Sequence, residues 1–164
     1  MSSVTAGSLL LSAVMGVAGI AALPVGVDPT PPQEAAACAL ITTEEAAAAL
    51  HITAAEAKSS DSPEMKERGQ SRCVFGPTKG FGDVVTVLLE TGIDPLDQNG
   101  LTELATSMGI GDTAKPIEGF GVFAAAMEDM PTIVAQKGSA VVLVSAPTMD
   151  GTRDLMARAL ARVH

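Results

Sequence analysis

Tryptophan and tyrosine are absent from this sequence of 164 residues, and its only other large aromatic side chains are four phenylalanines, Phe75, Phe81, Phe120 and Phe123. The core must therefore be aliphatic, and the aromatic platform on which sugars usually stack is missing. With 19 acidic and 10 basic residues, the formal net charge is −9. Such a charge repels phosphate backbones and anionic lipid headgroups, so we expect no nucleic-acid partner.

Charge is also missing from the front of the chain. No acidic residue precedes Asp28 and no Lys or Arg precedes Lys58, whereas residues 7–27 are almost wholly apolar. We interpret residues 1–22 as a signal peptide or an N-terminal anchor, although the basic start of a signal peptide is lacking. Cleavage is expected near Ala21 or Ala22. If the segment is retained, its length of about 20 apolar residues suits a membrane anchor. The prediction is a secreted or extracytoplasmic protein of the cell envelope, with membrane contact only through this segment.

The rest of the chain is predicted to be a short linker and one domain. Residues 23–34 are rich in proline and form the linker, and residues 35–164 are long enough for a single domain with its own core. Ala35 to Ala37 precede Cys38 and resemble the small residues before a lipidated cysteine. The polar linker separates Cys38 from the apolar stretch, however, so lipidation there is the less favoured alternative.

Helix signals occur at three places. Thr42 and Glu45 form a capping box, in which each side chain binds a free backbone amide of the other residue. Asp94 followed by proline begins a second helix, which Gly109 ends. A stripe of apolar residues marks a third near the end of the chain. The predicted helices span residues 43–50, 95–108 and 152–163.

Strand signals lie between these helices. Extended segments are predicted over residues 73–75, 84–90, 121–127, 132–136 and 140–145. The near-continuous apolar run at 84–90 suits a central strand covered on both faces. Gly138 suits the positive φ of a type II′ hairpin turn. Residues 58–70 are polar and predicted to be a loop, preceded by a second capping box at Thr53 and Glu56. The expected fold is α+β, a mostly antiparallel sheet with three helices packed on it as a two-layer sandwich.

The two cysteines, Cys38 and Cys73, are predicted to form a structural disulfide. An export segment places them in an oxidising compartment, and the loop of about 36 residues between them gives a chain-entropy gain of roughly 4 kcal/mol. A catalytic dithiol would show the spacing Cys-x-x-Cys, which is missing. A zinc site would also require His51 and His164, and no local ligand pair exists to begin one.

The remaining candidates for chemistry are weak. His51 follows a predicted helix end, where the helix dipole stabilises a positively charged imidazolium. It has no nucleophile near it in the sequence to activate. Met127 to Pro131 combines thioethers and acids as a soft-metal site does, but it occurs once and where a turn is expected. The glycine clusters at 109–112 and 119–121 lack the strand, turn and helix order of a nucleotide site. We therefore predict no catalytic residue, no cofactor and no metal site.

One family resemblance covers about residues 36–163. Cys38 opens the run Cys-Ala-Leu-Ile-Thr-Thr-Glu-Glu-Ala, Cys73 opens Cys-Val-Phe, and a Lys137-Gly turn precedes the last strand and an amphipathic helix. The chain thus resembles small secreted proteins and lipoproteins of actinobacteria, of unknown function, that share Cys-x-Leu-[Leu/Ile]-Thr-x-x-Glu and a second cysteine before an aromatic residue. The resemblance implies helices on an antiparallel sheet, a disulfide between Cys38 and Cys73, and a place in the cell envelope. This chain departs from it in having no separate lipidated cysteine and in having Phe75 where Trp or Tyr is common.

Three functions remain open from the sequence. The first is a non-enzymatic binding or accessory domain that uses a face of its sheet to bind a protein or a small apolar ligand. The second is an enzyme whose carboxylates converge only in the fold, with Glu90, Asp94, Asp112 and Glu128 as nominees. The third is a structural protein anchored in the membrane. Two nominees buried in one cleft, with a raised pKa, would favour the enzyme, and an apolar groove with no titratable side chain in its lining would favour binding.

Overall fold

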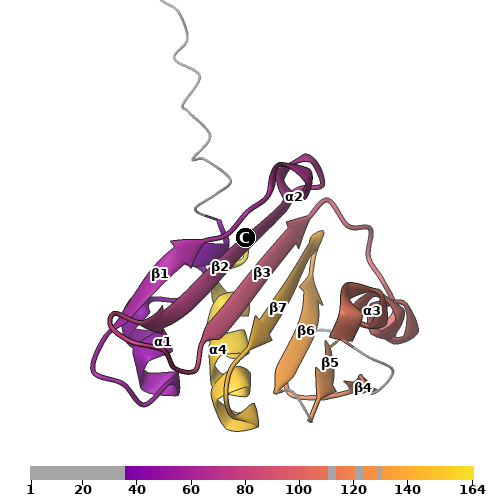
Figure 1. The fold of residues 1–164 in the computed structure, drawn as a ribbon. Coiled ribbons are helices and arrows are strands. Elements are labelled where there is room, and N and C mark those ends of the chain that lie inside the picture. The colour runs from indigo at the N-terminus through magenta and orange to yellow at the C-terminus, as the bar shows by residue number, and fades with distance from the viewer. Residues whose placement is uncertain (1–35, 111–113, 121–123, 129–130) are drawn as a thin grey trace, which may run out of the picture.

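A single sheet organises the domain. The computed structural model describes residues 36–110, 114–120, 124–128 and 131–164. Within this part, seven antiparallel strands form a sheet of order β1-β2-β3-β7-β6-β5-β4 (Figure 1). The strands are β1 (Ala55–Ser59), β2 (Gln70–Pro77), β3 (Val85–Thr91), β4 (Lys115–Pro116), β5 (Ala124–Met127), β6 (Thr132–Lys137) and β7 (Ala140–Ser145).

Helices cover the two faces of this sheet unequally. They are α1 (Thr43–Ala49), α2 (Pro63–Glu67), α3 (Gln98–Ala105) and α4 (Met149–Arg162), with a 3-10 turn η2 (Ala37–Ala39) and a π-helical turn η3 (Thr106–Ile110). α1 and α4 lie behind the sheet in Figure 1, whereas α3 lies on the other side, beside β5 and β6. The α+β class and the antiparallel sheet are confirmed. The described residues hold four α-helices instead of three, and α3 adds a third layer at one end.

Alternation along the strands divides the core in two. On β3, Val85, Val87 and Leu89 point into the main core with α1 and α4, whereas Leu88 faces the other side and is only half-buried. A smaller core under α3 holds Leu101 and residues of β5, β6 and β7. The expectation that residues 84–90 are covered on both faces is therefore wrong. α3 covers the far end of the sheet and leaves β1, β2 and β3 open on that side (Figure 1).

The segment predicted to be a polar loop contains two regular elements. β1 pairs along its whole length with β2, and Ser62 caps α2 by accepting a hydrogen bond from the backbone N–H of Met65. Residues 58–70 are thus a strand end, a helix and the start of β2. The prediction of a second capping box at Thr53 and Glu56 is also wrong, because Glu56 lies within β1. Pairing with β2 decides the conformation of this alanine-rich stretch.

α3 begins later than its sequence signals predict. Asp97, and not Asp94, is the N-cap, with its carboxylate accepting a hydrogen bond from the Gly100 N–H at 2.7 Å. The buried Gln136 amide explains the delay, because it accepts from the Leu96 N–H at 2.8 Å and donates to the Asp94 carbonyl at 3.0 Å. These bonds hold residues 94–96 against β6, outside the helix. Gly109 lies in the π-helical turn and does not end the helix directly after 108.

α4 is fixed at both ends. Its N-cap is Thr148, so it begins at Met149 and not near Thr152. At the other end, the Lys137 ammonium donates to the carbonyls of Leu160 and Val163 at 2.8 and 2.9 Å, which satisfies groups that a helix end leaves free. Lys137 begins the β6–β7 turn, where Gly138 has the positive φ of +60° expected from the sequence. The hairpin prediction is confirmed.

α1 ends in a Schellman motif with an unusual residue at its centre. The N–H of Ile52 bonds to the carbonyl of Ala47 at 3.0 Å, and the N–H of His51 bonds to that of Ala48 at 3.2 Å. This geometry requires a left-handed backbone at His51, whose φ is +54°. Glycine normally fills such a position because it has no Cβ to clash there.

Replacing His51 by glycine is therefore expected to stabilise the domain by about 1 kcal/mol, since a left-handed backbone costs an ordinary residue roughly 1–2 kcal/mol. Thermal unfolding should show a midpoint higher by about 3 to 6 °C. The matched variant His51→Ala keeps the Cβ and should show no such gain. Equal stabilisation by both variants would mean that the imidazole, and not the backbone, is unfavourable.

Candidate functional site

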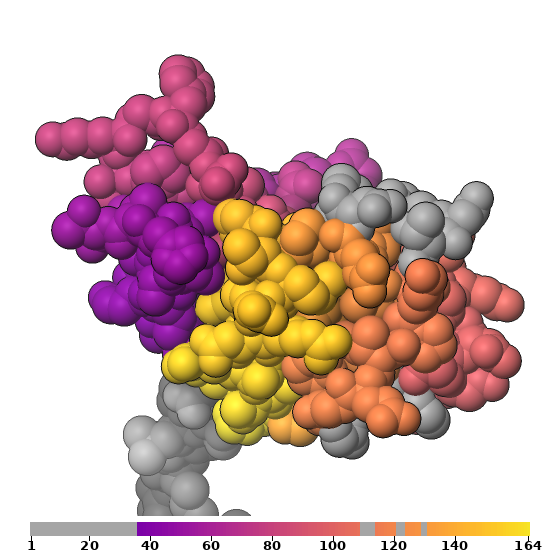
Figure 2. All heavy atoms as spheres, turned by 90° about the horizontal axis from the view of Figure 1, so that it is seen from below, coloured from indigo at the N-terminus to yellow at the C-terminus, as the bar shows by residue number. Residues whose placement is uncertain are grey.

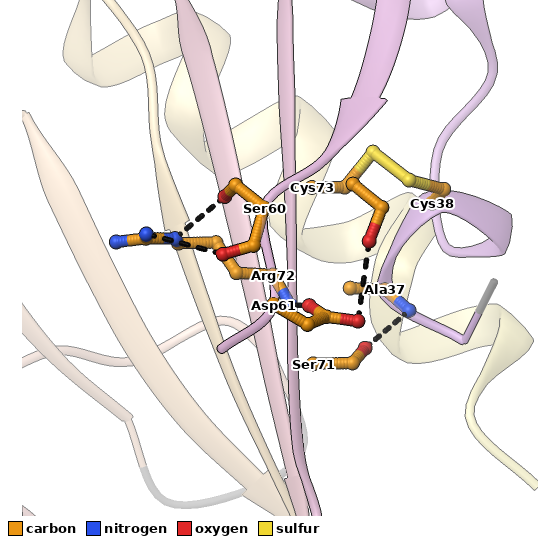
Figure 3. Close-up of a disulfide and its surroundings, with 8 residues drawn as sticks. Ala37, Cys38, Ser60, Asp61, Ser71, Arg72 and Cys73 are labelled. Atoms are coloured by element: carbon orange, nitrogen blue, oxygen red, sulfur yellow. Dashed lines mark hydrogen bonds between the residues drawn. A yellow bond between two sulfur atoms is a disulfide. The ribbon is translucent and has the colours of Figure 1, made fainter. Parts of the chain in front are cut away.

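The disulfide joins the first described turn to the sheet (Figure 3). Cys38 of η2 and Cys73 of β2 are bonded, with their Cα atoms 5.1 Å apart. The pairing predicted from the sequence is confirmed. Both cysteines of the chain are used, so neither offers a thiolate for catalysis or metal binding in the oxidised protein.

Hydrogen bonds on both sides of the disulfide hold the same strand. The buried Ser71 hydroxyl accepts from the Ala37 N–H at 2.8 Å. On the solvent side, the Arg72 guanidinium donates to the Ser60 hydroxyl at 2.8 Å, and the Arg72 N–H donates to the Asp61 carboxylate (Figure 3). β2 is thus tied to η2 and to the link between β1 and α2. The region is a structural junction.

The carboxylates nominated for an enzyme do not converge. Glu90 is half-buried on β3, Asp94 is exposed before α3, and Glu128 is exposed after β5. Asp112 lies outside the described residues. The three that are described line none of the clefts considered below.

The metal and histidine candidates give no site within the described part of the chain. No group of three or more His, Cys, Asp or Glu side chains there is arranged to hold a metal ion. His51 and His164 are both exposed, the first at the end of α1 and the second at the end of the chain. Asp129 and Met130 of the expected soft-metal motif lie outside the described residues.

The surface that α3 leaves uncovered is the strongest candidate for function. We call it the open face: the side of β1, β2 and β3 turned away from α1 and α4. Its side chains alternate in sequence with those of the main core, and they are those of Glu56, Lys58, Gln70, Arg72, Val74, Thr86, Leu88 and Glu90. A sheet face of mixed aliphatic and charged side chains can bind another surface without any chemical step.

A cleft of about 220 Å³ lies on the open face at the turn between β2 and β3. Glu56, Lys58, Val74 and Val84 line it, and residues 80–82 form part of its rim. The turn projects beyond the body of the molecule, as the pink segment at the upper left of Figure 2 shows. This projection is on the side opposite to α1 and α4 (Figure 2).

Large apolar side chains at the rim of this cleft are exposed to solvent. Phe81 is fully exposed and Val84 is 46% exposed, and among the described residues these are the large hydrophobic side chains left in solvent. Gly80 and Gly82 flank Phe81, and Gly80 has a φ of +82° that other residues rarely adopt. The chain thus presents a phenylalanine at the tip of a turn, beside a cleft. The sequence signal is Gly-Phe-Gly at residues 80–82, between the strands predicted at 73–75 and 84–90, and no site was predicted there.

The polar wall of the cleft is electrically balanced. The Lys58 ammonium lies 2.6 Å from the Glu56 carboxylate, and their side chains are 71% and 42% exposed. Both charges sit two residues apart on the open face of β1, the edge strand of the sheet. The cleft therefore offers apolar side chains and a neutral ion pair, which suits a ligand group without net charge.

A larger cleft of about 640 Å³ lies between α1 and α4, but the charged side chains there already bind one another and so join the two helices. The Arg162 guanidinium binds the Glu45 carboxylate with two hydrogen bonds, of 2.7 and 2.8 Å, and Arg158 adds a third at 3.2 Å. The hydrogen bonds from Arg162 lower the pKa of the Glu45 carboxyl from 4.5 to about 2, against the opposing effect of burial. Glu45 is therefore ionised at neutral pH and cannot serve as a general acid.

A third cleft, of about 600 Å³, lies along α3 beside Pro116. Its hydroxyl groups already donate to carbonyls of their own helix, Thr102 to Gln98 at 2.8 Å and Thr106 to Thr102 at 3.0 Å. They have no hydrogen left for a ligand. This arrangement is ordinary for threonine on a helix surface.

Two further searches, one for a membrane-spanning helix among the described residues and one for similar proteins, found nothing that identifies the site. Within the described residues, no helix combines the length and apolar character needed to cross a bilayer. Comparison with protein-family models, with curated proteins and with solved structures finds no significant match to this chain.

Proposed function

We propose that the protein is an exported, non-enzymatic binding domain of the cell envelope and that it binds a partner through the cleft on the open face. The observation that carries this proposal is the full exposure of Phe81 beside that cleft. Exposing a phenylalanine to water forgoes roughly 2 kcal/mol of burial, and a ligand that covers the ring recovers this free energy. The disulfide fits a location outside the cytosol, where thiols oxidise.

The size of the cleft favours a protein partner over a small molecule. Pockets for small organic ligands usually enclose roughly 300–1,000 Å³. The cleft on the open face encloses about 220 Å³, which is room for one large aliphatic side chain. A partner that inserts one such side chain beside Phe81 would gain a buried anchor, and the ion pair of Glu56 and Lys58 would lie at its edge.

Binding to this cleft is testable with a minimal probe. In NMR titrations of the exported protein with N-acetyl-leucine amide, we expect chemical-shift changes at Val74, Val84 and residues 80–82. Replacement of Phe81 by alanine should weaken this binding by about threefold or more, because it removes apolar area from the rim. N-acetyl-glutamine amide should bind more weakly than the leucine probe.

The matched control is Thr78→Ala, a change in the same exposed turn outside the lining of the cleft. It should leave binding of the leucine probe unchanged. Shifts confined to the cleft between α1 and α4, or equal weakening by the Thr78 and Phe81 variants, would exclude the proposed site.

A further inference from the structure

Among the residues that the structure describes, the outer edge of β1 has no partner strand. β1 is the first strand of the sheet order, and within this part of the chain it pairs on one side only, with β2. In Figure 1 no described element lies along its other side. Its sequence is Ala-Glu-Ala-Lys-Ser, and the small residues at 55, 57 and 59 leave the backbone of this edge accessible.

The hydrogen-bond pattern determines which backbone groups this edge presents. The Ser60 N–H donates to the carbonyl of Arg72, its partner in the register of β1 and β2. In an antiparallel pair, residues alternate between bonding inward and outward. Lys58 and Glu56 therefore bond to β2, whereas Ala57 and its neighbours at 55 and 59 point their N–H and C=O groups away from the sheet.

We propose that this edge binds a second copy of the same chain, with the two β1 strands antiparallel about a two-fold axis at Ala57. In this register Ala57 faces Ala57 of the second copy, and Ala55 faces Ser59 of the second copy. All of these residues point their backbone groups outward, so each pair exchanges two N–H···O=C bonds. The result is one continuous sheet through both copies, held by an isologous contact.

The charges of β1 select this register. With the axis at Ala57, Glu56 lies opposite Lys58 of the second copy on the open face, and Lys58 lies opposite Glu56 of the second copy. These are the non-hydrogen-bonded pairs, whose Cα atoms lie about 4.5 Å apart and whose side chains are closest. The intrachain ion pair at 2.6 Å thereby becomes part of a ring of four alternating charges.

The neighbouring registers are disfavoured by the same two residues. Moving the axis to Glu56 keeps outward groups opposite outward groups, but it places the two Glu56 carboxylates face to face. Moving it to Lys58 places the two ammonium groups face to face. Like charges directly opposite each other destabilise a strand pair, whereas opposite charges stabilise it. Among these alignments, only the axis at Ala57 pairs opposite charges.

This assembly goes beyond the binding function proposed above and does not depend on it. Glu56 and Lys58 also line the cleft on the open face, so the two clefts of the dimer would adjoin across the axis. A partner with two equivalent contact points would then bind both copies at once, with the gain in affinity that two linked contacts provide.

Charge reversal on β1 tests the proposal directly. We would measure the dimer dissociation constant of the exported form of the full chain by sedimentation velocity over a concentration series. Glu56→Lys alone and Lys58→Glu alone each place like charges opposite each other, so each should weaken the dimer by about tenfold or more. The double variant Glu56→Lys/Lys58→Glu restores opposite charges and should dimerise like the original chain.

An equimolar mixture of the two single variants provides the sharpest result. Each single variant should be monomeric at concentrations where the mixture forms a heterodimer, because a chain with two basic residues then faces one with two acidic residues. Ala57→Pro should abolish dimers while circular dichroism and thermal unfolding stay unchanged, since proline is tolerated on a strand edge whose N–H faces solvent.

Other outcomes would overturn the proposal. An original chain that stays monomeric at millimolar concentration would do so, as would a dimer that both single charge variants leave unchanged. Failure of the mixture to associate, with both single variants folded by circular dichroism, would exclude the register at Ala57. If Phe81→Ala binds the leucine probe as well as the original chain does while the dimer behaves as expected, the proposed function is overturned and the assembly stands, so the two proposals fail separately.

Discussion

Removing the disulfide is expected to lower the free energy of unfolding by about 4 kcal/mol, because it frees the unfolded chain from a closed loop of about 36 residues. Cys38→Ala with Cys73→Ala is the variant, since alanine leaves no polar group in the buried position of Cys73. The loss is a large part of the stability of a single domain. Chemical denaturation at neutral pH should show a much lower midpoint for the double variant.

Reduction of the original protein distinguishes the stability that comes from the covalent cross-link from the stability that comes from the packing of the two sulfur atoms. Dithiothreitol should destabilise the original chain nearly as much as the double substitution does, and it should leave the double variant unchanged. If the reduced protein unfolds at the same denaturant concentration as the oxidised one, the hydrogen bond from Ala37 to Ser71 and the packing of η2 suffice to hold this junction.

Replacing Glu45 by alanine should cost about 2 kcal/mol, the second largest effect. The carboxylate is 14% exposed and serves two structures at once. It completes the capping box of α1 by accepting from the Thr42 N–H at 2.8 Å, a contribution of about 1 kcal/mol. It also binds Arg162 and Arg158 of α4, and the partial exposure of Arg162 limits its ion pair with Glu45 to about 1 kcal/mol. Urea denaturation at pH 7 measures the sum.

The same carboxylate predicts how stability depends on pH. The pKa of Glu45 is about 2 in the folded protein against an ordinary value of 4.5. A carboxyl whose pKa is lowered by folding stabilises the fold fully above its unfolded pKa, and this contribution is lost as the pH falls from about 4.5 toward 2. Glu45→Gln should therefore flatten the decline of stability in this acid range.

Glu103→Gln is the matched control for this measurement. Glu103 is an exposed glutamate on α3, and its replacement should leave the acid decline as steep as in the original protein. If Glu45→Gln and Glu103→Gln give the same curve between pH 4.5 and 2, the contact of α1 with α4 is not what acid disrupts.

Elements defined by neighbouring residues were predictable from the sequence. The Thr42 hydroxyl and the Glu45 carboxylate bind amides within one turn of helix, so the capping box needs nothing beyond α1. Gly138 likewise determines its own hairpin turn. The disulfide was predictable for a different reason, because the apolar start of the chain indicates an oxidising compartment for its two cysteines.

Elements defined by distant partners were not predictable. β1 has the composition of a helix or a loop, and only its register with β2 makes it a strand. The start of α3 depends on Gln136, which lies far away in the sequence. The candidate site was missed for the same reason, because the exposure of Phe81 depends on where α3 lies on the sheet and how far the turn projects.

The tie between α1 and α4 bears on when the protein can fold. Arg162 donates hydrogen bonds to the carbonyl of Leu40, at 2.8 Å, and to the carboxylate of Glu45. In the sheet, β7 lies between β3 and β6, although it comes late in the chain. α1 and the middle of the sheet therefore lack these neighbours until β7 and α4 have been synthesised. The main core cannot close before then, so the apolar side chains of β2 and β3 stay uncovered while the earlier part of the chain is being made.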